Sequence, residues 1–289
     1  MIKNYLKSCL QYLLPKQALT TLAGLLATVT NPTIKHFFIT RFIQAYSVNM
    51  QEAKEEDPTQ YSHFNDFFIR HLKPECRPIA KAAIVSPVDG CISELGNIEF
   101  GRLLQAKRRH YSLQTLLATD ETRCADFYGG RFITLYLSPK DYHRVHMPLD
   151  ATITDMIYVP GQLFSVQPAT TRCIPNLFAR NERLVVFCNT ELGKMAMVLV
   201  GAAIVGAIGT TWHGDLKRGR HAQHVVYSEV EPLFKRKAEE MGYFKLGSTV
   251  ILLFADPTRM QWEPALRQGD PLRLGQPLGN ELPDVHYDA

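Results

Sequence analysis

The sequence predicts an α+β fold, in which N-terminal amphipathic helices are followed by a mostly β domain. Two observations support this. Apolar residues recur every three or four positions over roughly the first 50 residues. Beyond residue 80, short runs rich in β-branched and aromatic residues alternate with Gly and Pro. We therefore divide the chain of 289 residues into a helical segment, 1–50, and a larger domain, 51–289.

Three helices are expected in the first segment. The first covers 2–14 and ends at Pro15. The second covers 19–29 and is stopped by Pro32, and the third covers 34–46. Each helix has an apolar face, so each needs a partner surface.

Charge indicates what that partner surface is. Residues 1–51 contain five basic residues and no Asp or Glu, whereas the rest of the chain has 27 basic and 28 acidic residues. Apolar faces flanked only by cations suit an anionic membrane interface. A helical cap packed on the protein's own core fits the same periodicity. No stretch reaches the roughly 20 apolar residues of a membrane-spanning helix.

The larger domain begins with an acidic linker, 51–60, and a short helix at 64–72. The β-type runs lie at 83–85, 131–137, 151–159, 184–190, 195–208, 225–230 and 250–254. Helices are expected at 111–118 and 232–241.

Composition argues against several classes of function. The six cysteines are widely separated and form no C-x-x-C pair, which is typical of reduced thiols in a cytosolic protein and not of a zinc site. The basic runs at 107–109 and 235–237 lack interleaved aromatic residues, which argues against nucleic acid as a partner.

Three short segments contain residues suited to catalysis. SPVDG at 86–90 presents Asp89 in a turn, where an aspartate commonly serves only to form the turn. His143 and His146 lie three residues apart in a loop, where they could serve acid–base chemistry or simply be exposed. The Gly247-Ser248 step enters an apolar strand and could be no more than a bulge. The pair His221 and His224 has no comparable neighbours, and we assign it to the surface.

Together these segments could form a site if the fold brings them together. A serine hydroxyl becomes a nucleophile when a base lies beside it and a third group orients that base. A hydrolase acting on an external ester or peptide, and a membrane-associated binding module without catalysis, both remain compatible with these residues.

The order and spacing of the segments resemble those of the bacterial phosphatidylserine decarboxylases, a pyruvoyl-enzyme family. The resemblance extends from about Phe64 to the end of the chain. Its motifs are FFIRHLKP at 67–74, RPI at 77–79, SPVDG at 86–90, DYHRVHMP at 141–148, VPGQLFSV at 159–166 and LGST at 246–249.

The resemblance implies that the proenzyme cuts itself between Gly247 and Ser248. It implies His146 as the base, Asp89 as the residue that orients the imidazole, and Ser248 as the precursor of a covalent pyruvoyl group. The products would be a β chain, 1–247, and an α chain, 248–289, which stay associated. The pyruvoyl group would form a Schiff base with the headgroup of phosphatidylserine and release CO₂ to give phosphatidylethanolamine.

The resemblance also suggests further roles and partners. His143 is our candidate for the acid that reprotonates the product, and the loop 161–166 is expected close to the headgroup. The helical segment 1–50 would associate with an anionic membrane, with the enzyme peripheral on the cytoplasmic face of the cell membrane and assembled as a homodimer of αβ heterodimers. No metal, nucleotide or nucleic acid is implied.

Overall fold

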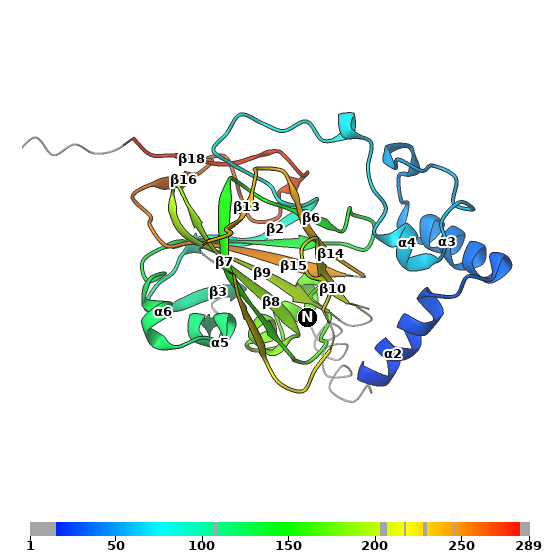
Figure 1. Cartoon of the computed structure of the whole chain (residues 1–289), viewed down its shortest axis with the longest axis horizontal. Coiled ribbons are helices and arrows are strands. Elements are labelled where there is room, and N and C mark those ends of the chain that lie inside the picture. The colour runs from blue at the N-terminus through cyan, green and yellow to red at the C-terminus, as the bar shows by residue number, and fades with distance from the viewer. Residues whose placement is uncertain are drawn as a thin grey trace, which may run out of the picture.

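The structure is a computed structural model that describes residues 16–106, 109–202, 207–216, 218–227, 230–245 and 247–283. Helices α2 (Lys16–Ala27) and α3 (Pro32–Tyr46) lie at one end of the molecule, beside a β domain (Figure 1). The α+β class and the order of helices before strands are therefore confirmed. The helix predicted at 2–14 lies outside the described residues.

Local sequence explains where α3 begins and how it docks. Asn31 caps the helix by accepting hydrogen bonds from the backbone N–H groups of Thr33 and Ile34, and Pro32 occupies the first turn. Buried Ile39 packs with Val48, Tyr61 and Phe67, and so attaches α3 to the short helix α4 (Phe64–Phe68). The predicted helix at 64–72 is therefore present but shorter.

The remaining helical elements are short. They are η1 (Met50–Glu52), η2 (Pro74–Cys76), α5 (Leu113–Leu117), α6 (Glu121–Ala125), α7 (Pro168–Thr171) and α8 (Leu177–Arg180). The predicted acidic linker at 51–60 is tied to the domain at its start, because Ala53 forms a β-bridge with Leu72.

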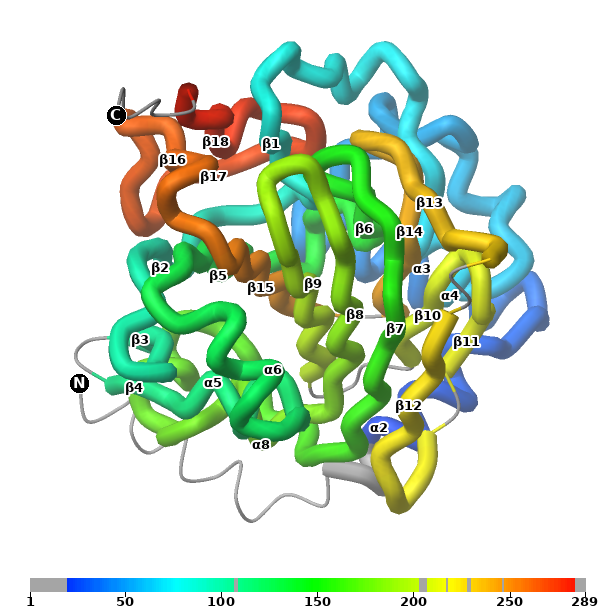
Figure 2. Tube along the Cα trace, turned by 60° about the vertical axis from the view of Figure 1, so that its left-hand side comes forward, coloured from blue at the N-terminus to red at the C-terminus, as the bar shows by residue number. Residues whose placement is uncertain are grey.

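The large sheet is antiparallel at every pairing. Its strands, in spatial order, are β12 (Gln223–Val226), β7 (Ala151–Val159), β8 (Arg183–Thr190), β9 (Gly193–Gly201), β15 (Ser248–Phe254), β5 (Arg131–Leu137), β2 (Gly90–Asn97) and β17 (Pro271–Leu272), and β13 (Leu233–Lys235) also pairs with β7. Figure 2 shows the central strands side by side, with α5, α6 and α8 together on one side of them.

Three smaller sheets complete the domain. The first contains β11 (Gly214–Asp215), β10 (Ile208–Thr210), β14 (Glu240–Phe244) and β6 (Arg144–His146). The second contains β1 (Ile84–Val85), β18 (Pro277–Glu281) and β16 (Met260–Trp262), and the third pairs β3 (Arg102–Ala106) with β4 (Arg109–Ser112).

Side chains of β15 alternate between two hydrophobic clusters. Val250, Leu252 and Phe254 pack in the cluster that includes β6 and β14, whereas Ile251 and Leu253 pack in the cluster covered by α5 and α8. This alternation is the period of two expected for a strand buried on both faces. Even-numbered positions of β15 thus face the sheet that contains β6.

One expected element is wrong. Residues 232–241 form β13, a turn and the start of β14 instead of a helix. Ala238 has a φ of 64°, a left-handed conformation that a right-handed helix excludes. The backbone of β13 forms its hydrogen bonds with β7, in place of the bonds that it would have formed within a helix.

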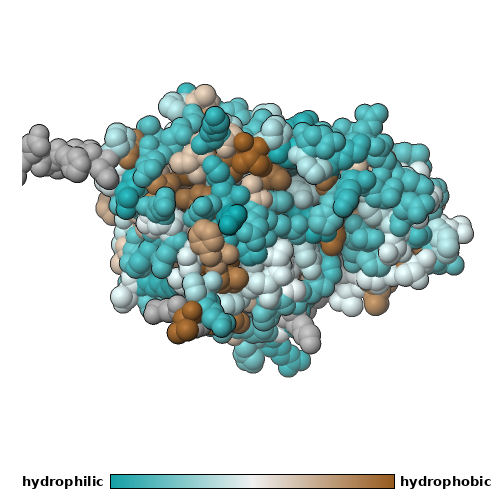
Figure 3. Space-filling view, turned by 45° about the horizontal axis from the view of Figure 1, so that its top comes forward, coloured by the Kyte–Doolittle hydropathy of each residue, from teal (hydrophilic) through white to brown (hydrophobic). Residues whose placement is uncertain are grey.

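Most other strand predictions are confirmed, including 131–137 and 151–159. Within the described residues, no helix is long and apolar enough to cross a bilayer. On the face shown in Figure 3, hydrophobic residues form separate patches in a surface that is mainly hydrophilic.

We expect Gly242→Ala to destabilise the protein. A Cβ at this position of β14 would lie 2.2 Å from the backbone oxygen of Gly209 and would push β10 away. Overpacking of this kind lowers the free energy of unfolding by about 1–3 kcal/mol. Gly24→Ala on α2 is the control, since nothing lies within 4 Å of its Cβ position. Urea denaturation of both variants would contradict the argument if their midpoints matched.

Candidate active site

Ser248 lies at the point where β15 enters the large sheet. It pairs with Leu137 of β5 on one side and with Gly201 of β9 on the other, and it is fully buried. Its position is even, like that of Val250, so its side chain faces the sheet that contains β6. Among the described residues, its Oγ has no hydrogen-bond partner. A buried hydroxyl without a partner is uncommon. Thr134 and Thr249 also have such a hydroxyl among the described residues, so the preceding Gly247 is what distinguishes Ser248.

Two chain segments connect Ser248 to the histidines. After Leu137, the chain loops through 138–143 into β6. On the other side, β14 pairs with β6 and continues through Gly247 into β15, and the backbone N–H of Phe244 donates to the carbonyl of His143. The fold therefore brings two of the three predicted catalytic segments to one face of the sheet.

His143 is fully buried as a neutral imidazole. Its Nδ1 lies 2.7 Å from the carbonyl oxygen of Asp141, and because a carbonyl only accepts, Nδ1 is the protonated nitrogen. Burial lowers the pKa of His143 to about 3 despite this hydrogen bond. Nε2 thus carries a lone pair, and it has no partner among the described residues. The ring packs against Phe68, with 4.2 Å between ring centroids.

Both ring nitrogens of His146 have hydrogen-bond partners. Nδ1 donates to the carbonyl of Ala238 at 2.8 Å, and Nε2 lies 3.2 Å from the hydroxyl of Tyr142. By the same reasoning Nε2 is the acceptor. Burial lowers the pKa of His146, so both imidazoles are neutral at pH 7 and available as bases.

Asp89 is held by an arginine. The Arg77 guanidinium donates to both carboxylate oxygens of Asp89, at 2.5–3.1 Å, and also to Glu52 at 2.7 Å. The backbone N–H of Leu274 donates to Oδ1 of Asp89 at 2.8 Å. In the part of the chain that the structure describes, no hydrogen bond joins Asp89 to His146. The Ala238 carbonyl holds Nδ1 of His146 in this structure, and the role of Asp89 as the orienter of the imidazole stays a prediction.

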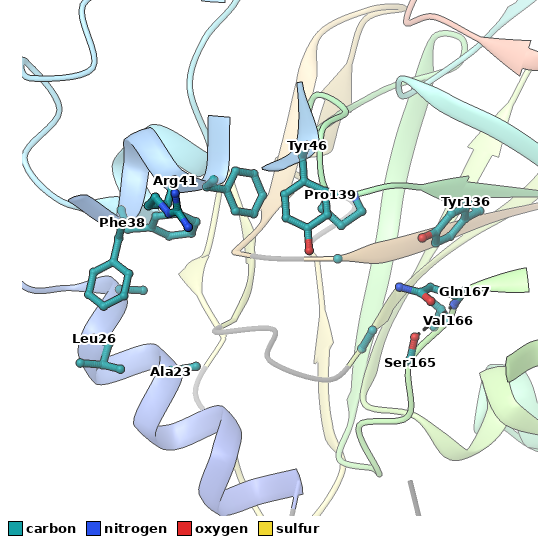
Figure 4. A pocket seen from close by; sticks show the side chains of 15 residues that line it. Ala23, Leu26, Phe38, Arg41, Tyr46, Tyr136, Pro139, Ser165, Val166 and Gln167 are labelled. Atoms are coloured by element: carbon teal, nitrogen blue, oxygen red, sulfur yellow. Dashed lines mark hydrogen bonds between the residues drawn. The ribbon is translucent and has the colours of Figure 1, made fainter. Parts of the chain in front are cut away.

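An apolar cavity of about 560 Å³ opens beside Gly247. Its walls come from α2, α3, the start of α4 and the end of the large sheet, as Figure 4 shows. Ser165, Val166 and Gln167 lie across the cavity from α3 (Figure 4), so the end of the loop 161–166 lines this cavity. Its approach to a headgroup stays a prediction. Cavities of this size and character bind mainly apolar ligands.

A polar cavity of about 460 Å³ shares Tyr136 with the apolar one. It is lined by the Arg77–Asp89 pair and by Arg70, which is 4% exposed and donates from Nη2 to the carbonyl of Lys140. Nε and Nη1 of Arg70 have no partner among the described residues.

Sequence reasoning did not assign Arg77, Tyr142 or Ala238 to the site. Arg77 and Tyr142 lie within the motifs RPI at 77–79 and DYHRVHMP at 141–148. Their place in these motifs was the signal in the sequence that could have identified them. Ala238 contributes a backbone carbonyl, which leaves no signal in side-chain chemistry. His221 and His224 are exposed, as expected.

A buried hydroxyl next to a glycine that lines an apolar cavity, together with two neutral imidazoles on the neighbouring segment, provides the groups that acyl-transfer chemistry needs. Comparisons with known proteins identify the family. A family model described as phosphatidylserine decarboxylase matches residues 64–280, and a second, described as PSD, matches 6–47.

Relatives match over nearly the whole chain. A protein of Legionella pneumophila (strain Lens) is 57% identical over 279 residues, which are 96% of this chain and 99% of that protein. A protein of Aliivibrio fischeri (strain MJ11) is 51% identical, with 96% and 99% covered, and one of Saccharophagus degradans is 47% identical, with 95% and 97% covered. Each is named phosphatidylserine decarboxylase proenzyme. The chain belongs to the phosphatidylserine decarboxylase family.

Burial of neutral His143 makes stability depend on pH. The unfolded chain binds a proton below about pH 6.5, whereas the folded chain does so only near pH 3. The contribution of His143 is therefore complete above pH 6.5 and decreases as the pH falls toward 3. Between pH 7.5 and 5.5 we expect a loss of about 1.4 kcal/mol from this residue.

Urea denaturation at the two pH values tests this expectation in Ser248→Ala, which keeps one uncut chain under our proposal below. Adding His143→Asn removes the titrating group, so the double variant should lose about 1.4 kcal/mol less over the same interval. Equal losses in the two chains would contradict a neutral, buried His143.

Proposed function

We propose that this protein cuts its own Gly247–Ser248 bond and then converts phosphatidylserine to phosphatidylethanolamine and CO₂. The observation that carries the proposal is Ser248, whose buried, unpartnered hydroxyl follows a glycine at the start of a central strand. The family of the chain supports the reaction, since its relatives are named as decarboxylase proenzymes.

The cut is an acyl shift followed by an elimination. Ser248 Oγ bonds to the carbonyl carbon of Gly247 and loses its proton to a base, and the Gly247–Ser248 C–N bond breaks to leave an ester and a free amine. A base next removes the Cα proton of residue 248, and the Gly247 carboxylate leaves. Water then replaces the nitrogen, which departs as ammonia, so that the new chain begins with a ketone.

Gly247 has the freedom that this attack needs. Its φ is 36°, in the left-handed region that favours glycine, and nothing lies within 4 Å of the place where a Cβ would stand. The open space lies on the side of the apolar cavity, which Gly247 lines.

The surroundings of Ser248 fit a pyruvoyl group formed from it. The side chain is buried, and no partner among the described residues competes for its Oγ. The segment that carries the two neutral imidazoles continues from Leu137, the β5 partner of Ser248. Such a group supplies an electron-accepting carbonyl for removal of the carboxylate as CO₂. Around it, the protein excludes water and moves protons.

We assign the two histidines to different steps. His146 serves as the base in the cut, with its ring held by Ala238 and its Nε2 released when the Tyr142 hydroxyl turns away. His143, with Nδ1 fixed by Asp141, takes up a proton from water on its free Nε2 and passes that proton to the product carbon after CO₂ has left. In this proposal Asp89 supports the site through Arg77 and Leu274, which hold the strands around it.

Cutting need not separate the two chains. Each residue of β15 pairs with β9 on one side and with β5 on the other, from Ser248 to Phe254. The β18 strand of the proposed α chain also pairs with β1. The chain 248–289 therefore stays associated with 1–247. Its assembly into a homodimer of heterodimers remains a prediction.

A lipid substrate accounts for the cavity and for the helices above it. Leu22, Leu25 and Leu26 of α2 and Ile34 and Phe37 of α3 are 43–65% exposed, although they are large and apolar. Exposed apolar side chains on helices without an acidic residue suit insertion at the boundary of an anionic bilayer. In this arrangement acyl chains pass between α2 and α3 into the cavity, and the headgroup approaches Gly247. Location of the enzyme on the cytoplasmic face of the cell membrane remains a prediction.

Self-cutting is tested by intact mass and a denaturing gel. The purified protein should give two chains, divided before residue 248, with no free amine on the smaller one. Ser248→Ala should remain a single chain of full mass because it lacks the attacking oxygen, and Thr249→Ala, one residue further on, should still cut. A single unbroken wild-type chain that reacts with a fluorophosphonate would instead favour a hydrolase.

Substitution of each histidine tests its assigned role in the same assay. His146→Ala should remain uncut. His143→Ala should cut normally yet release CO₂ at least about 100-fold more slowly, because a positioned acid contributes 10²–10⁴-fold. The reverse pattern would exchange the two roles.

Membrane docking is tested by replacing the exposed apolar residues. Leu25→Asp with Phe37→Asp should reduce binding to vesicles that contain phosphatidylserine by at least about tenfold, since two side chains no longer enter the bilayer. Cutting should be unaffected. Phe100→Asp is the control, because Phe100 is 96% exposed and directly precedes β3, a strand on the opposite side of the molecule from α2 and α3 in Figure 1. Equal binding of the double variant and the wild type would exclude docking through these helices.

A further inference from the structure

An arginine side chain lines the apolar cavity, where an apolar ligand would give it no partner. Within the described part of the chain, Arg41 is the charged side chain that lines this cavity, and the surrounding walls include Phe38, Phe42, Leu26 and Ala23. Figure 4 places Arg41 on α3 near Phe38, across from Ser165 and Gln167. A cation in such surroundings needs either water or an anion.

No group among the residues that the structure describes supplies that anion. Among the described residues Arg41 forms no ion pair and no side-chain hydrogen bond, although it is exposed and available. By contrast, Lys35 on the same helix is fixed, since its Nζ donates to the carbonyls of Thr59 and Tyr61. The five donors of the Arg41 guanidinium are therefore free to bind a ligand at the mouth of the cavity.

Arg41 lies on the same side of the cavity as apolar side chains of α3, across from Tyr136 (Figure 4). Phe38 and Phe42, three residues before and one after it, line the same cavity and present apolar surface for acyl chains. Gly247 and Tyr136 line the inner end of the cavity, where the reacting amine must arrive under the proposed function. The phosphate of a phospholipid lies between its acyl chains and its amine.

We infer that Arg41 binds the phosphodiester of the lipid substrate and thereby positions the headgroup toward residue 248. Arginine is suited to this task because its planar fork matches two phosphate oxygens. The inference rests on the proposed function and adds a specificity-determining residue to it. Arg41 acts on the substrate's phosphate and takes no part in the cut.

Binding to the uncut Ser248→Ala chain tests this independently of activity. The probes are short-chain lipids kept below their micelle concentration: dihexanoyl phosphatidylserine, dihexanoyl phosphatidylethanolamine and dihexanoylglycerol, measured by calorimetry. Adding Arg41→Gln should weaken binding of both phospholipids by about tenfold or more, as expected for loss of charge-assisted hydrogen bonds. Binding of dihexanoylglycerol, which has no phosphate, should change less than about twofold.

Controls separate this effect from others. Arg259→Gln removes an exposed cation outside the cavity and should leave all three affinities unchanged. Arg41→Lys should retain part of the affinity for both phospholipids, because it keeps the charge but loses the fork. On the background with Ser248 present, Arg41→Gln should still give two chains on a gel.

Three results would overturn the inference. An equal loss for all three lipids would mean that Arg41 shapes the cavity. A loss for phosphatidylserine alone would mean that it binds the carboxylate, and no loss for any lipid would mean that it contacts none of them. If the chain without the Arg41 substitution bound none of the lipids, the lipid cavity of the proposed function would itself be wrong.

Discussion

The hydrogen bonding of β15 to a neighbour on each side is the constraint on which the rest of the structure depends. It fixes Ser248 as the first residue of a strand, with Leu137 and Gly201 as its partners. The preceding residue, Gly247, lies just outside the ladder, where its backbone is free to adopt a positive φ. A rigid serine next to a permissive glycine is the arrangement that an attack on the intervening bond requires. The same ladder retains the strand after that bond is broken.

Burial, more than ion pairing, sets the chemistry of this site. His143 and His146 are neutral because the protein shields them from water, and each donates from Nδ1 to a backbone carbonyl. Two acids that favour a charged His146, Glu240 and Asp89, are themselves paired with Arg144 and Arg77. This arrangement keeps lone pairs on the imidazoles at neutral pH. It also ties the turn at Asp89 to Leu274, across the proposed cut.

The helical end of the molecule and the catalytic end are joined by the apolar cavity. Residues of α2 and α3 form its outer wall, whereas Gly247 and Tyr136 form its inner end. α3 is attached to α4 through Ile39 and Phe67, and Phe68 of α4 packs on His143. One connected set of side chains therefore joins the helices proposed to contact lipid to the histidine proposed to transfer a proton. The proposed docking at a bilayer and the proposed reaction of the headgroup could therefore take place at the two ends of one cavity.

The sequence by itself determined the two described helices of the first segment and most strands, because their periodicities and Pro or Gly boundaries are local. It also pointed to His143, His146 and Ser248 as members of one site. The partner of Asp89, the left-handed turn at Ala238 and the strands within 232–241 were decided by the tertiary structure alone. The physical reason is that each depends on contacts far apart in the chain: Arg77 and Leu274 reach Asp89, and β7 pairs with β13 only after the large sheet has formed. A backbone carbonyl such as that of Ala238 carries no sequence signature, so only the folded chain reveals its hydrogen bond to His146.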